Sequence, residues 1–571
     1  MNNTEVAKIL EEIAELMEIK GDNPFKIRAY YNGSRIVEGL GQDINQVAAE
    51  GKLREIKGIG EGLAATISEL LKKNKSGVHE ELKKSLPRGI LDILRIPGLG
   101  PKKAKVIFDE LGVKSISQLE TACRKNKVAK LARFGEKTQT NILEAIKNLA
   151  KTDGSFLFSQ ASDESARLME FLKTSKDINR IEVAGSLRRR REIIHDVDIL
   201  VSTKKPKKIH DQFSSYSQIV RILAKGDTKS SAVLKSGIQA DLRTVTDQEF
   251  PSALYYFTGS KEHNVATRTI AKRMGLKISE YGIFRGKKLI PCEDEEDIFK
   301  TLKLSYVPPE MREDCGEIEA AGKNDLPKLI EQNDIKGIFH VHSDWSDGVA
   351  PLEKMIERAE SLGYQYVGIS DHSKTAVYAN GLSVERLKKQ HKELDRLQKK
   401  FKKIRIFRGT ESDILQDGSL DYPDHILDSF DFVIGSIHSR FKMPEEEMTK
   451  RICRAMEDPH MTIWGHPTGR LLLSRDGYAV NFERIFETAK KNQVVIEVNA
   501  NPNRLDLDWR LMRSAKEKGL RFSINPDAHS VAGLNDVTYG VGIARKGWLE
   551  KKDVINTMPV AEMERFLKKR K

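Results

Sequence analysis

Residues 337–348 read GIFHVHSDWSDG, with two histidines two positions apart and an aspartate five residues after the second. Side chains in a strand alternate between its two faces, so His340 and His342 in an apolar strand point to the same side. Similar apolar runs, most of which end near a His, Asp or Glu, recur through 336–571 with helical patterns between them. Alternating strands and helices predict a parallel sheet, open or closed into a barrel, with these polar groups at one end.

Nine residues at these strand ends are candidate metal ligands. Imidazole and carboxylate groups together suit Zn²⁺, Mn²⁺ or Fe²⁺, and the four cysteines form no Cys-x-x-Cys zinc motif. Nine ligands exceed the needs of one ion, so we expect two or three ions, which together polarise a phosphate and activate water. One such histidine alone would be explained as a satisfied surface or core residue, but nine at successive strand ends favour a metal centre. The candidates are His340, His342, Asp347, His372, Glu411, His438, His466, Asp527 and His529.

The segments FHVHSDWSDG, ISDH, GTE, GSIHS, WGHPTG, EVNANP and NPDAHS resemble the polymerase and histidinol phosphatase (PHP) domain. The resemblance covers 336–571 and implies a distorted, TIM-like α/β barrel whose phosphoesterase centre is held by all nine residues. It implies catalytic roles for His340, His342 and His372, of which the last is a candidate proton donor to the leaving oxygen. It implies phosphoester cleavage without choosing between DNA and a small phosphate.

A second cluster of acids lies in the α+β pattern of 151–314, around VAGSLRRRREIIHDVDILVS (183–202). Asp196 and Asp198 lie two apart in an apolar strand, so both carboxylates face one side, which is costly unless a cation lies between them. A third acid, Asp241, lies in the strand-like ADLRTV. Three carboxylates from adjacent strands can hold two Mg²⁺ ions for in-line phosphoryl transfer, and the alternative is that they are solvated acids at strand ends.

The spacing of Gly-Ser, Asp-x-Asp and the third aspartate resembles the nucleotidyltransferase superfamily, and YYFTGSKEHNVATRTIAKRMGLKISEYGIF (255–284) is similar to family X DNA polymerases. The resemblance implies that the three aspartates bind Mg²⁺ or Mn²⁺ and that dNTPs are the substrates. By their own chemistry Tyr256 and Phe257 would be predicted to be core residues. His195 and Lys261 differ from polymerase beta, which has a glycine and an acid there. The implied nucleotide-binding residues are Gly185, Ser186, Arg189, Tyr256, Phe257, Gly259, Asn264 and Arg268.

The first 150 residues predict short helices broken by glycine turns. IKGIGEGLAATISELL (56–71) is echoed by IPGLGPKKAKVIFDEL (96–111), which indicates one unit used again. Glycine turns let backbone amides approach a phosphate, and the N-terminus of the next helix adds positive charge. The turns resemble helix-hairpin-helix motifs, and NPFKIRAYYNGSRIV (23–37) resembles the family X domain that binds a DNA end at its 5′-phosphate. The implied DNA contacts are Lys26, Tyr30, Gly58, Gly60, Gly98, Gly100 and Lys102.

One family activity is not expected here. Polymerase beta uses a Schiff-base lysine in its first hairpin to remove 5′-deoxyribose phosphate, and Thr66 stands at the matching position of this chain. The sequence therefore argues against lyase activity by that route.

Composition places further limits on partners and location. A net charge of +14 favours a nucleic-acid partner through neutralisation of phosphates, with a merely basic enzyme as the alternative. Four scattered cysteines fit a reducing cytosol. The first 21 residues have an acidic amphipathic pattern rather than that of a signal peptide, and no apolar run approaches the roughly 20 residues that span a bilayer. We expect a cytoplasmic monomer that associates with the nucleoid and not with membranes.

The order of the parts resembles bacterial family X DNA polymerases with a C-terminal PHP domain. The resemblance implies a repair polymerase that fills short gaps in gapped or nicked DNA with a 5′-phosphate, and a metal-dependent 3′–5′ exonuclease, with cleavage at abasic sites left open. One alternative is a polymerase fused to a small-molecule phosphatase of the histidinol phosphate type, and another is a non-catalytic DNA-end-binding scaffold. Basic residues at the barrel mouth would favour DNA, and the candidates are Arg408, Arg440, Lys442 and Arg470. The expected parts are 1–85 (helical, DNA-end-binding), 86–150 (helix-hairpin-helix, fingers-like), 151–314 (palm and thumb), 315–335 (linker) and 336–571 (PHP barrel).

Overall fold

The computed structural model describes residues 1–569 except 2, 39, 41–43, 57, 88, 95, 97, 98, 133 and 153, and it describes only the backbone of 4, 38, 147–152 and 569. Its contacts divide the chain into two compact units. The first comprises 1–153, 342–358 and 528–534, and the second comprises 154–341, 359–527 and 535–571.

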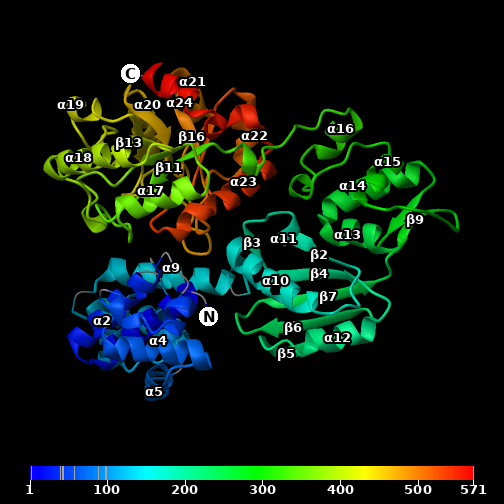
Figure 1. The fold of residues 1–571 in the computed structure, drawn as a ribbon, viewed down its shortest axis with the longest axis horizontal. Coiled ribbons are helices and arrows are strands. Elements are labelled where there is room, and N and C mark those ends of the chain that lie inside the picture. Colours follow the sequence, from blue (N-terminus) through cyan, green and yellow to red (C-terminus); the bar gives the residue numbers. More distant parts are fainter. Residues whose placement is uncertain are drawn as a thin grey trace. The chain divides into compact units, whose positions relative to one another are not determined.

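The N-terminal part of the first unit is helical (Figure 1). Its helices are α1 (Asn3–Lys20), α2 (Pro24–Glu38), α3 (Ile44–Ala49), α4 (Glu61–Lys73), α5 (Gly77–Ser85), α6 (Ile90–Leu94), α7 (Pro101–Leu111), α8 (Ile116–Arg124) and α9 (Glu136–Thr152), with the 3-10 helices η1 (Leu53–Glu55) and η2 (Val128–Lys130). Buried apolar residues from Val6 to Ile146 form one core. The parts expected at 1–85 and 86–150 therefore share a single hydrophobic core.

The expected palm lies in the second unit and contains a five-stranded sheet in the order β2-β4-β7-β6-β5. β4 runs parallel to β7 with Asp198 opposite Asp241, and the other neighbours are antiparallel. This register places the predicted aspartates on two adjacent strands. The elements are β1 (Phe156–Leu157), α10 (Phe158–Lys173), β2 (Arg180–Val183), α11 (Gly185–Arg188), β3 (Ile193–Ile194), β4 (Asp196–Ser202), α12 (Pro206–Ser214), β5 (Ile219–Lys225), β6 (Lys229–Leu234) and β7 (Gln239–Val245).

The expected thumb follows this sheet and has its own small core, to which buried Tyr255, Ile283 and Phe299 belong. It combines helices with a three-stranded antiparallel sheet in the order β10-β9-β8. Its elements are α13 (Phe250–Thr258), α14 (Lys261–Arg273), β8 (Lys277–Ser279), β9 (Gly282–Arg285), β10 (Lys288–Ile290), α15 (Glu295–Thr301), η3 (Pro309–Met311) and α16 (Glu317–Gly322). The last of these helices lies in the segment expected as a polar, partly helical linker.

The C-terminal sheet has seven parallel strands, each next to its neighbour in sequence, from β11 to β17. β17 returns beside β11, where the backbone N–H of Phe339 donates to Oδ1 of Asn525, so the sheet curves into a nearly closed barrel. This confirms the predicted TIM-like fold. The strands are β11 (Gly337–Val341), β12 (Tyr366–Ile369), β13 (Arg405–Asp413), β14 (Phe432–Ser436), β15 (Met461–Trp464), β16 (Val495–Asn499) and β17 (Phe522–Asn525).

Helices surround these strands (Figure 1). Met563 and Leu567 of the last helix pack against residues at which strands begin, such as Tyr366 and Val495, so this helix covers that end of the barrel. The helices are α17 (Leu352–Ser361), α18 (Val384–Lys400), α19 (Asp424–Leu427), α20 (Glu445–Met456), α21 (Phe482–Lys491), α22 (Trp509–Glu517), α23 (Val537–Lys546) and α24 (Val560–Lys569), with η4 (Gln332–Asp334), η5 (Val377–Ala379), η6 (Ala532–Asp536), η7 (Lys551–Asp553) and η8 (Ile555–Thr557). Among the described residues, no helix combines the length and apolar character needed to cross a membrane.

Candidate active sites

The three palm aspartates lie together. Asp196, Asp198 and Asp241 each offer a carboxylate oxygen, and these oxygens lie within 4.8 Å of one another. Burial and the two neighbouring carboxylates raise the pKa of Asp198 to about 7. Such repulsion is relieved by a cation, and hard divalent ions prefer carboxylate oxygens, so this donor set fits Mg²⁺ or Mn²⁺.

A lysine that sequence analysis did not identify reaches this cluster. Nζ of Lys229, the first residue of β6, lies 2.5 Å from Oδ2 of Asp241. Its charge offsets part of the repulsion among the carboxylates. One lysine among 97 basic residues carries no signal in sequence, because only the β6–β7 pairing brings it to the acids.

Gly185 lies against the aspartate cluster at the start of the short helix α11. A Cβ atom at this position would lie 2.2 Å from Oδ2 of Asp198, and the backbone has φ +63°. Only glycine fits both constraints. The Gly-Ser turn expected from the sequence is thus the first turn of α11, and it lies beside the carboxylates.

Arg189, a predicted triphosphate contact, is held by two groups of the thumb. Its Nε donates to Glu313 at 3.2 Å and its Nη1 donates to the carbonyl oxygen of Thr258 at 2.5 Å. Buried Lys546 of the barrel donates to Glu313 at 2.5 Å and to the carbonyl oxygen of Arg189 at 3.1 Å. Burial lowers the pKa of Lys546 to about 8, although Glu313 opposes the shift. An ionic network therefore joins the palm to the barrel at this arginine.

The remaining predicted nucleotide contacts lie on α13 and α14. Nδ2 of Asn264 donates to the carbonyl oxygen of Tyr256 at 2.8 Å, and Nε of Arg268 donates to that of Asn264 at 3.1 Å. Tyr256 and Phe257 meet edge to face, with ring centroids 5.3 Å apart. Both rings are half-buried rather than core residues. Gly259 follows α13 with φ +71°.

In the barrel, Glu411 is the centre of a histidine cluster. It is 1% exposed near the end of β13. Three histidines approach its Oε1 and a fourth approaches its Oε2. The distances are 3.3 Å from Nε2 of His340, 3.2 Å from Nε2 of His438, 2.8 Å from Nε2 of His466 and 3.0 Å from Nδ1 of His372. Nε2 of His340 also lies 3.4 Å from Oδ1 of Asp527.

The hydrogen bonds around this cluster favour a metal ion. Nδ1 of His340 lies 2.6 Å from Glu497, and Nδ1 of His438 lies 2.5 Å from Asp413. Carboxylates accept hydrogen bonds, so each Nδ1 carries a proton and each Nε2 is left to face Oε1 of Glu411. Positive charge is needed between these Nε2 atoms and the carboxylate, and a bound cation would supply it. Imidazoles oriented by carboxylates are a common arrangement of Zn²⁺, Mn²⁺ and Fe²⁺ ligands.

Electrostatics at His340 agrees with this conclusion. Burial opposes protonation, but Glu497, Asp527 and Glu411 outweigh it and raise the pKa of the ring well above its ordinary value. The site therefore stabilises positive charge. His340 and Asp527 also have positive φ, 58° and 50°, a conformation that costs energy outside glycine and that clusters at functional sites.

The other unit contains the remaining three candidates. Oδ1 of Asp347 lies 3.8 Å from Nδ1 of His342 and 3.4 Å from Nε2 of His529. The two imidazole rings stack with centroids 4.2 Å apart. The backbone N–H of His342 donates to the carbonyl oxygen of Ala528, which joins the segments after β11 and β17. These three side chains form a second small donor set.

Sequence analysis missed the residues that orient the ligands. Asp413 and Glu497 hold two histidines as described above, and Nε of Arg504 lies 3.3 Å from Oδ2 of Asp527. A signal was available for Asp413, which follows Glu411 by two residues in a strand and so shares its face. No local signal distinguished the other two.

In the helical part, the predicted DNA contacts differ in exposure. Tyr30 is 5% exposed, and its hydroxyl lies 3.0 Å from Oγ1 of Thr66, so it belongs to the core. Lys26 is exposed. Gly60 and Gly100 are the residues before α4 and α7, and Gly58 has φ +96°. Exposed Lys102 lies 3.9 Å from Glu18. Gly98 lies outside the described residues.

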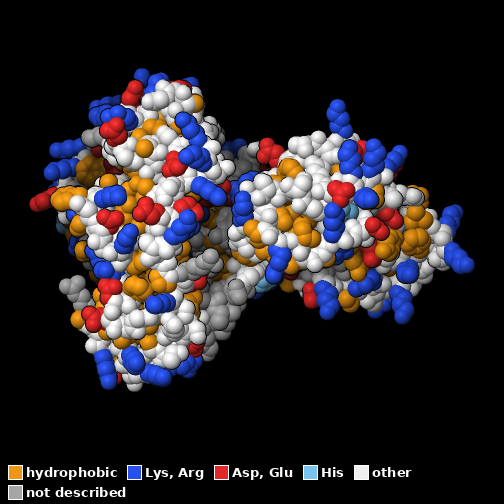
Figure 2. Space-filling view, turned by 90° about the horizontal axis from the view of Figure 1, so that it is seen from below, with side chains coloured by type: hydrophobic (Ala, Val, Ile, Leu, Met, Phe, Trp, Pro, Cys, Tyr) orange, Lys and Arg blue, Asp and Glu red, His pale blue; other side chains and the backbone are white. Residues whose placement is uncertain are grey.

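On the face shown in Figure 2, lysines and arginines are spread among acidic residues rather than gathered into one patch that could mark the path of DNA. Of the basic residues considered for the barrel mouth, Arg408 contacts Asp395 and Arg470 lies 2.6 Å from Asp508. Each of these two arginines therefore pairs with an acidic side chain.

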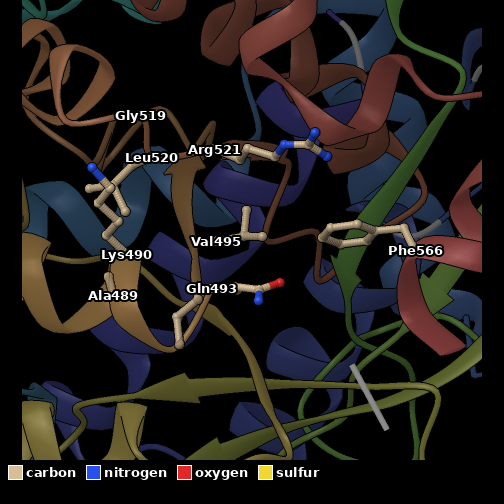
Figure 3. Close-up of a pocket in the computed structure, with 9 residues that line it drawn as sticks. Ala489, Lys490, Gln493, Val495, Gly519, Leu520, Arg521 and Phe566 are labelled. Atoms are coloured by element: carbon tan, nitrogen blue, oxygen red, sulfur yellow. The ribbon is translucent and has the colours of Figure 1, made fainter. Parts of the chain in front are cut away.

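A cavity of about 270 Å³ lies at the opposite end of the barrel (Figure 3). Lys490, Val495, Arg521 and Phe566 line it, beside the beginnings of β16 and β17. Its lining among the described residues includes no acidic or histidine side chain. The candidate metal ligands follow the other ends of the strands, so this cavity is separate from them.

Family models match four parts of the chain. The DNA polymerase beta thumb matches 253–313 and the PHP domain matches 339–501. A helix-hairpin-helix domain matches 1–76, and a SAM-like helix-hairpin-helix tandem matches 90–148.

Relatives match either the whole chain or a part of it. The chain is 40% identical over 573 residues to the DNA polymerase/3′-5′ exonuclease PolX of Bacillus subtilis (strain 168), and the match covers 100% of both proteins. Probable phosphatases of Thermoanaerobacter sp. (strain X514) and Clostridium acetobutylicum are each 26% identical, over 185 and 201 residues. Those matches cover 31% and 34% of this chain and 73% and 78% of those proteins.

Proposed function

Because the chain belongs to the family of the DNA polymerase/3′-5′ exonuclease PolX, we propose that it fills short gaps in DNA from dNTPs in its palm and removes 3′-terminal nucleotides in its PHP barrel. We infer gap filling from the three aspartates that converge from β4 and β7. We infer removal of 3′-terminal nucleotides from Glu411 and its four histidines.

In the palm, Asp196, Asp198 and Asp241 hold the divalent ions. Mg²⁺ or Mn²⁺ bound there would neutralise the charge that develops on the transferred phosphate. Nε2 of Gln239 donates to Oδ1 of Asp241 at 3.0 Å, which fixes this carboxylate to orient the 3′-hydroxyl of the primer. The three acids thus bring the attacking oxygen and the phosphorus together.

The incoming nucleotide contacts both sides of this cluster. The triphosphate binds to Gly185 and Ser186 at the start of α11 and to the guanidinium of Arg189. To reach it, Arg189 must give up its hydrogen bond to Glu313. The base and sugar contact the segment that joins α13 and α14. The residues proposed for that contact are Tyr256, Phe257, Gly259, Asn264 and Arg268.

Substitution of Asp241 tests the palm assignment. Asp241→Asn keeps the shape of the side chain but removes the charge that holds a cation. We expect gap filling on a labelled one-nucleotide-gapped duplex to fall more than about a hundredfold, since even changes behind metal ligands cost 10–100-fold. Asp247→Asn, a matched change just after β7, should keep activity. Full synthesis by Asp241→Asn would refute the assignment.

We propose that the two donor sets described above hold Mn²⁺, Zn²⁺ or Fe²⁺ ions, two or three in all. One set is Glu411 with its four histidines and Asp527, and the other is His342, Asp347 and His529. Such ions polarise a phosphodiester and make water a nucleophile near neutral pH. Glu497 and Asp413 keep the lone pairs of His340 and His438 directed at the site. His372 contacts Oε2 of Glu411, away from the other three histidines, and is proposed to protonate the leaving oxygen.

A small-molecule phosphatase is the second candidate for the barrel, because two relatives matched over part of the chain are called probable phosphatases. The two functions are separated by substrate. With Mn²⁺ and no dNTP, we expect the protein to shorten the labelled 3′-end of a gapped duplex and to leave histidinol phosphate intact. Rapid release of phosphate from histidinol phosphate without shortening would favour the phosphatase.

The helical part is proposed to bind gapped or nicked DNA at its 5′-phosphate. Gly58, Gly60 and Gly100 lie just before helices, where free backbone amides attract phosphate, and Lys26 and Lys102 add charge. We propose that the protein acts as a monomer in the cytoplasm, on the nucleoid. A scaffold without catalysis would bind such DNA and neither fill nor shorten it.

A further inference from the structure

Two adjacent apolar side chains are exposed beside the histidine cluster of the barrel. Val377 is 81% exposed and Tyr378 is 69% exposed, both in the 3-10 helix η5. Large apolar side chains next to each other on a surface are informative, because burial would remove them from water. Of the two, Tyr378 has its ring next to a candidate active site, where it can contact a bound ligand.

The ring of Tyr378 lies close to two candidate ligands. Its centroid is 6.2 Å from the ring of His372 and 6.2 Å from the ring of His438. These two histidines and Glu411 offer ligand atoms within 4.8 Å of one another. A phosphoester bound at this cluster would therefore have an aromatic ring close beside it.

The loop that carries Tyr378 is anchored on both sides. Ala376 and Ala379 are buried, and the N–H of Gly381 donates to the carbonyl oxygen of Ala376 at 3.0 Å. A Cβ atom on Gly381 would lie 1.9 Å from the carbonyl oxygen of Ser373, so the loop is closely packed. The backbone on both sides of Tyr378 is therefore packed against the barrel, which fixes the position of the tyrosine.

The same loop is connected to the groups that orient the ligands. Oγ1 of Thr375 donates to Asp413 at 3.1 Å, and Asp413 holds Nδ1 of His438. The backbone N–H of Thr375 donates to Asp421 at 2.7 Å. The position of the tyrosine ring is therefore set relative to the histidine cluster, as a recognition element requires.

We propose that Tyr378 is a stacking platform for the base of the 3′-terminal nucleotide whose phosphodiester is bound at the His372–Glu411–His438 cluster. Every nucleobase has a flat π-face, so one aromatic ring serves all four bases without reading sequence. The inference rests on the proposed exonuclease function and adds a ligand class, nucleoside phosphodiesters.

The test compares two DNA ends that differ only in the base. Two gapped duplexes carry a labelled strand that ends in thymidine or in a tetrahydrofuran abasic residue. The full-length wild type, Tyr378→Ala, Tyr378→Phe and Val377→Ala are compared by kcat/KM for release of the terminal residue with Mn²⁺. Thermal unfolding and gap filling report on the integrity of each variant.

We expect Tyr378→Ala to lose roughly tenfold or more on the thymidine end, as removal of a stacking ring does, and to match the wild type on the abasic end. Tyr378→Phe keeps the ring and should keep the preference, and Val377→Ala should resemble the wild type. Equal loss on both ends, or no loss on either, would overturn the stacking role. If the wild type shortens neither end, the exonuclease function itself is wrong.

Discussion

Nδ1 of His340 lies 2.6 Å from a carboxylate oxygen of Glu497, although 157 residues separate them in sequence. The same carboxylate accepts hydrogen bonds from the backbone N–H of His466 at 2.7 Å and from Nδ2 of Asn525 at 2.9 Å. One buried acid on β16 therefore contacts two candidate ligands, His340 on β11 and His466 just after β15. Its negative charge favours a proton on Nδ1 of His340.

Glu497→Gln removes that charge and retains the shape. We expect 3′-shortening to fall about 10–100-fold, the usual cost of changing a group behind a metal ligand, with gap filling unchanged. Glu487→Gln, an exposed change on α21, is the control and should keep both activities. Unaltered shortening by Glu497→Gln would show that this acid does not support the site.

Lys229 competes with cations for Asp241. A metal ion that binds the palm acids must displace or outweigh the ammonium group 2.5 Å from Oδ2. Lys229→Ala should therefore lower the Mg²⁺ concentration for half-maximal gap filling several-fold. A Mg²⁺ titration measures this, with exposed Lys235→Ala as the control. A higher Mg²⁺ requirement in Lys229→Ala would contradict the argument.

Lys546 of the barrel affects the polymerase through Glu313. Without the lysine, the charge of Glu313 is balanced by Arg189 and Arg191 alone, so Arg189 is held more tightly away from a nucleotide. We expect Lys546→Met to raise the KM for dNTP several-fold with a smaller change in kcat and unchanged 3′-shortening. Steady-state gap filling at varied dNTP concentration measures KM and kcat separately.

A second substitution checks the cause of that effect. Glu313→Gln removes the charge that holds Arg189, so the double variant with Lys546→Met should recover most of the wild-type KM. If the double variant is as impaired as Lys546→Met alone, the lysine acts through packing rather than through Glu313.

His391 makes the stability of the barrel depend on pH. Burial, with help from nearby Arg408, lowers the pKa of this imidazole to about 4. The unfolded chain takes up the proton near pH 6.5, so stability should fall as pH drops from about 6.5 to about 4. Between pH 7 and pH 5, the melting temperature of His391→Phe should fall by less than that of the wild type. An equal loss in both proteins would contradict the shifted pKa.

The barrel was predictable because its signals are local. Apolar runs that end near a His, Asp or Glu predicted the alternation of strands and helices, with His340, Glu411 and His438 at one end. The palm aspartates were predictable for the same reason, since Asp196 and Asp198 share a strand face. The structure places both groups as their spacing indicates.

The residues that support these groups were not predictable, because long-range packing creates their roles. Glu497 and Lys546 each act on a partner more than a hundred residues away. Long-range packing also decides the place of Tyr30. The resemblance implied a DNA contact for this residue, whereas its ring packs in the helical core and its hydroxyl lies beside the hydroxyl of Thr66. Sequence spacing does not reveal which face of α2 the core takes.

One assay tests the central claim that the chain carries two independent phosphoester centres. A labelled one-nucleotide-gapped duplex is incubated with Mn²⁺, with and without dNTPs, using wild type, Asp198→Asn and Glu411→Gln. We predict that Asp198→Asn loses gap filling and keeps 3′-shortening, and that Glu411→Gln loses shortening and keeps gap filling. Loss of both activities from either substitution, or shortening that survives Glu411→Gln, would contradict two separate centres in the palm and the barrel.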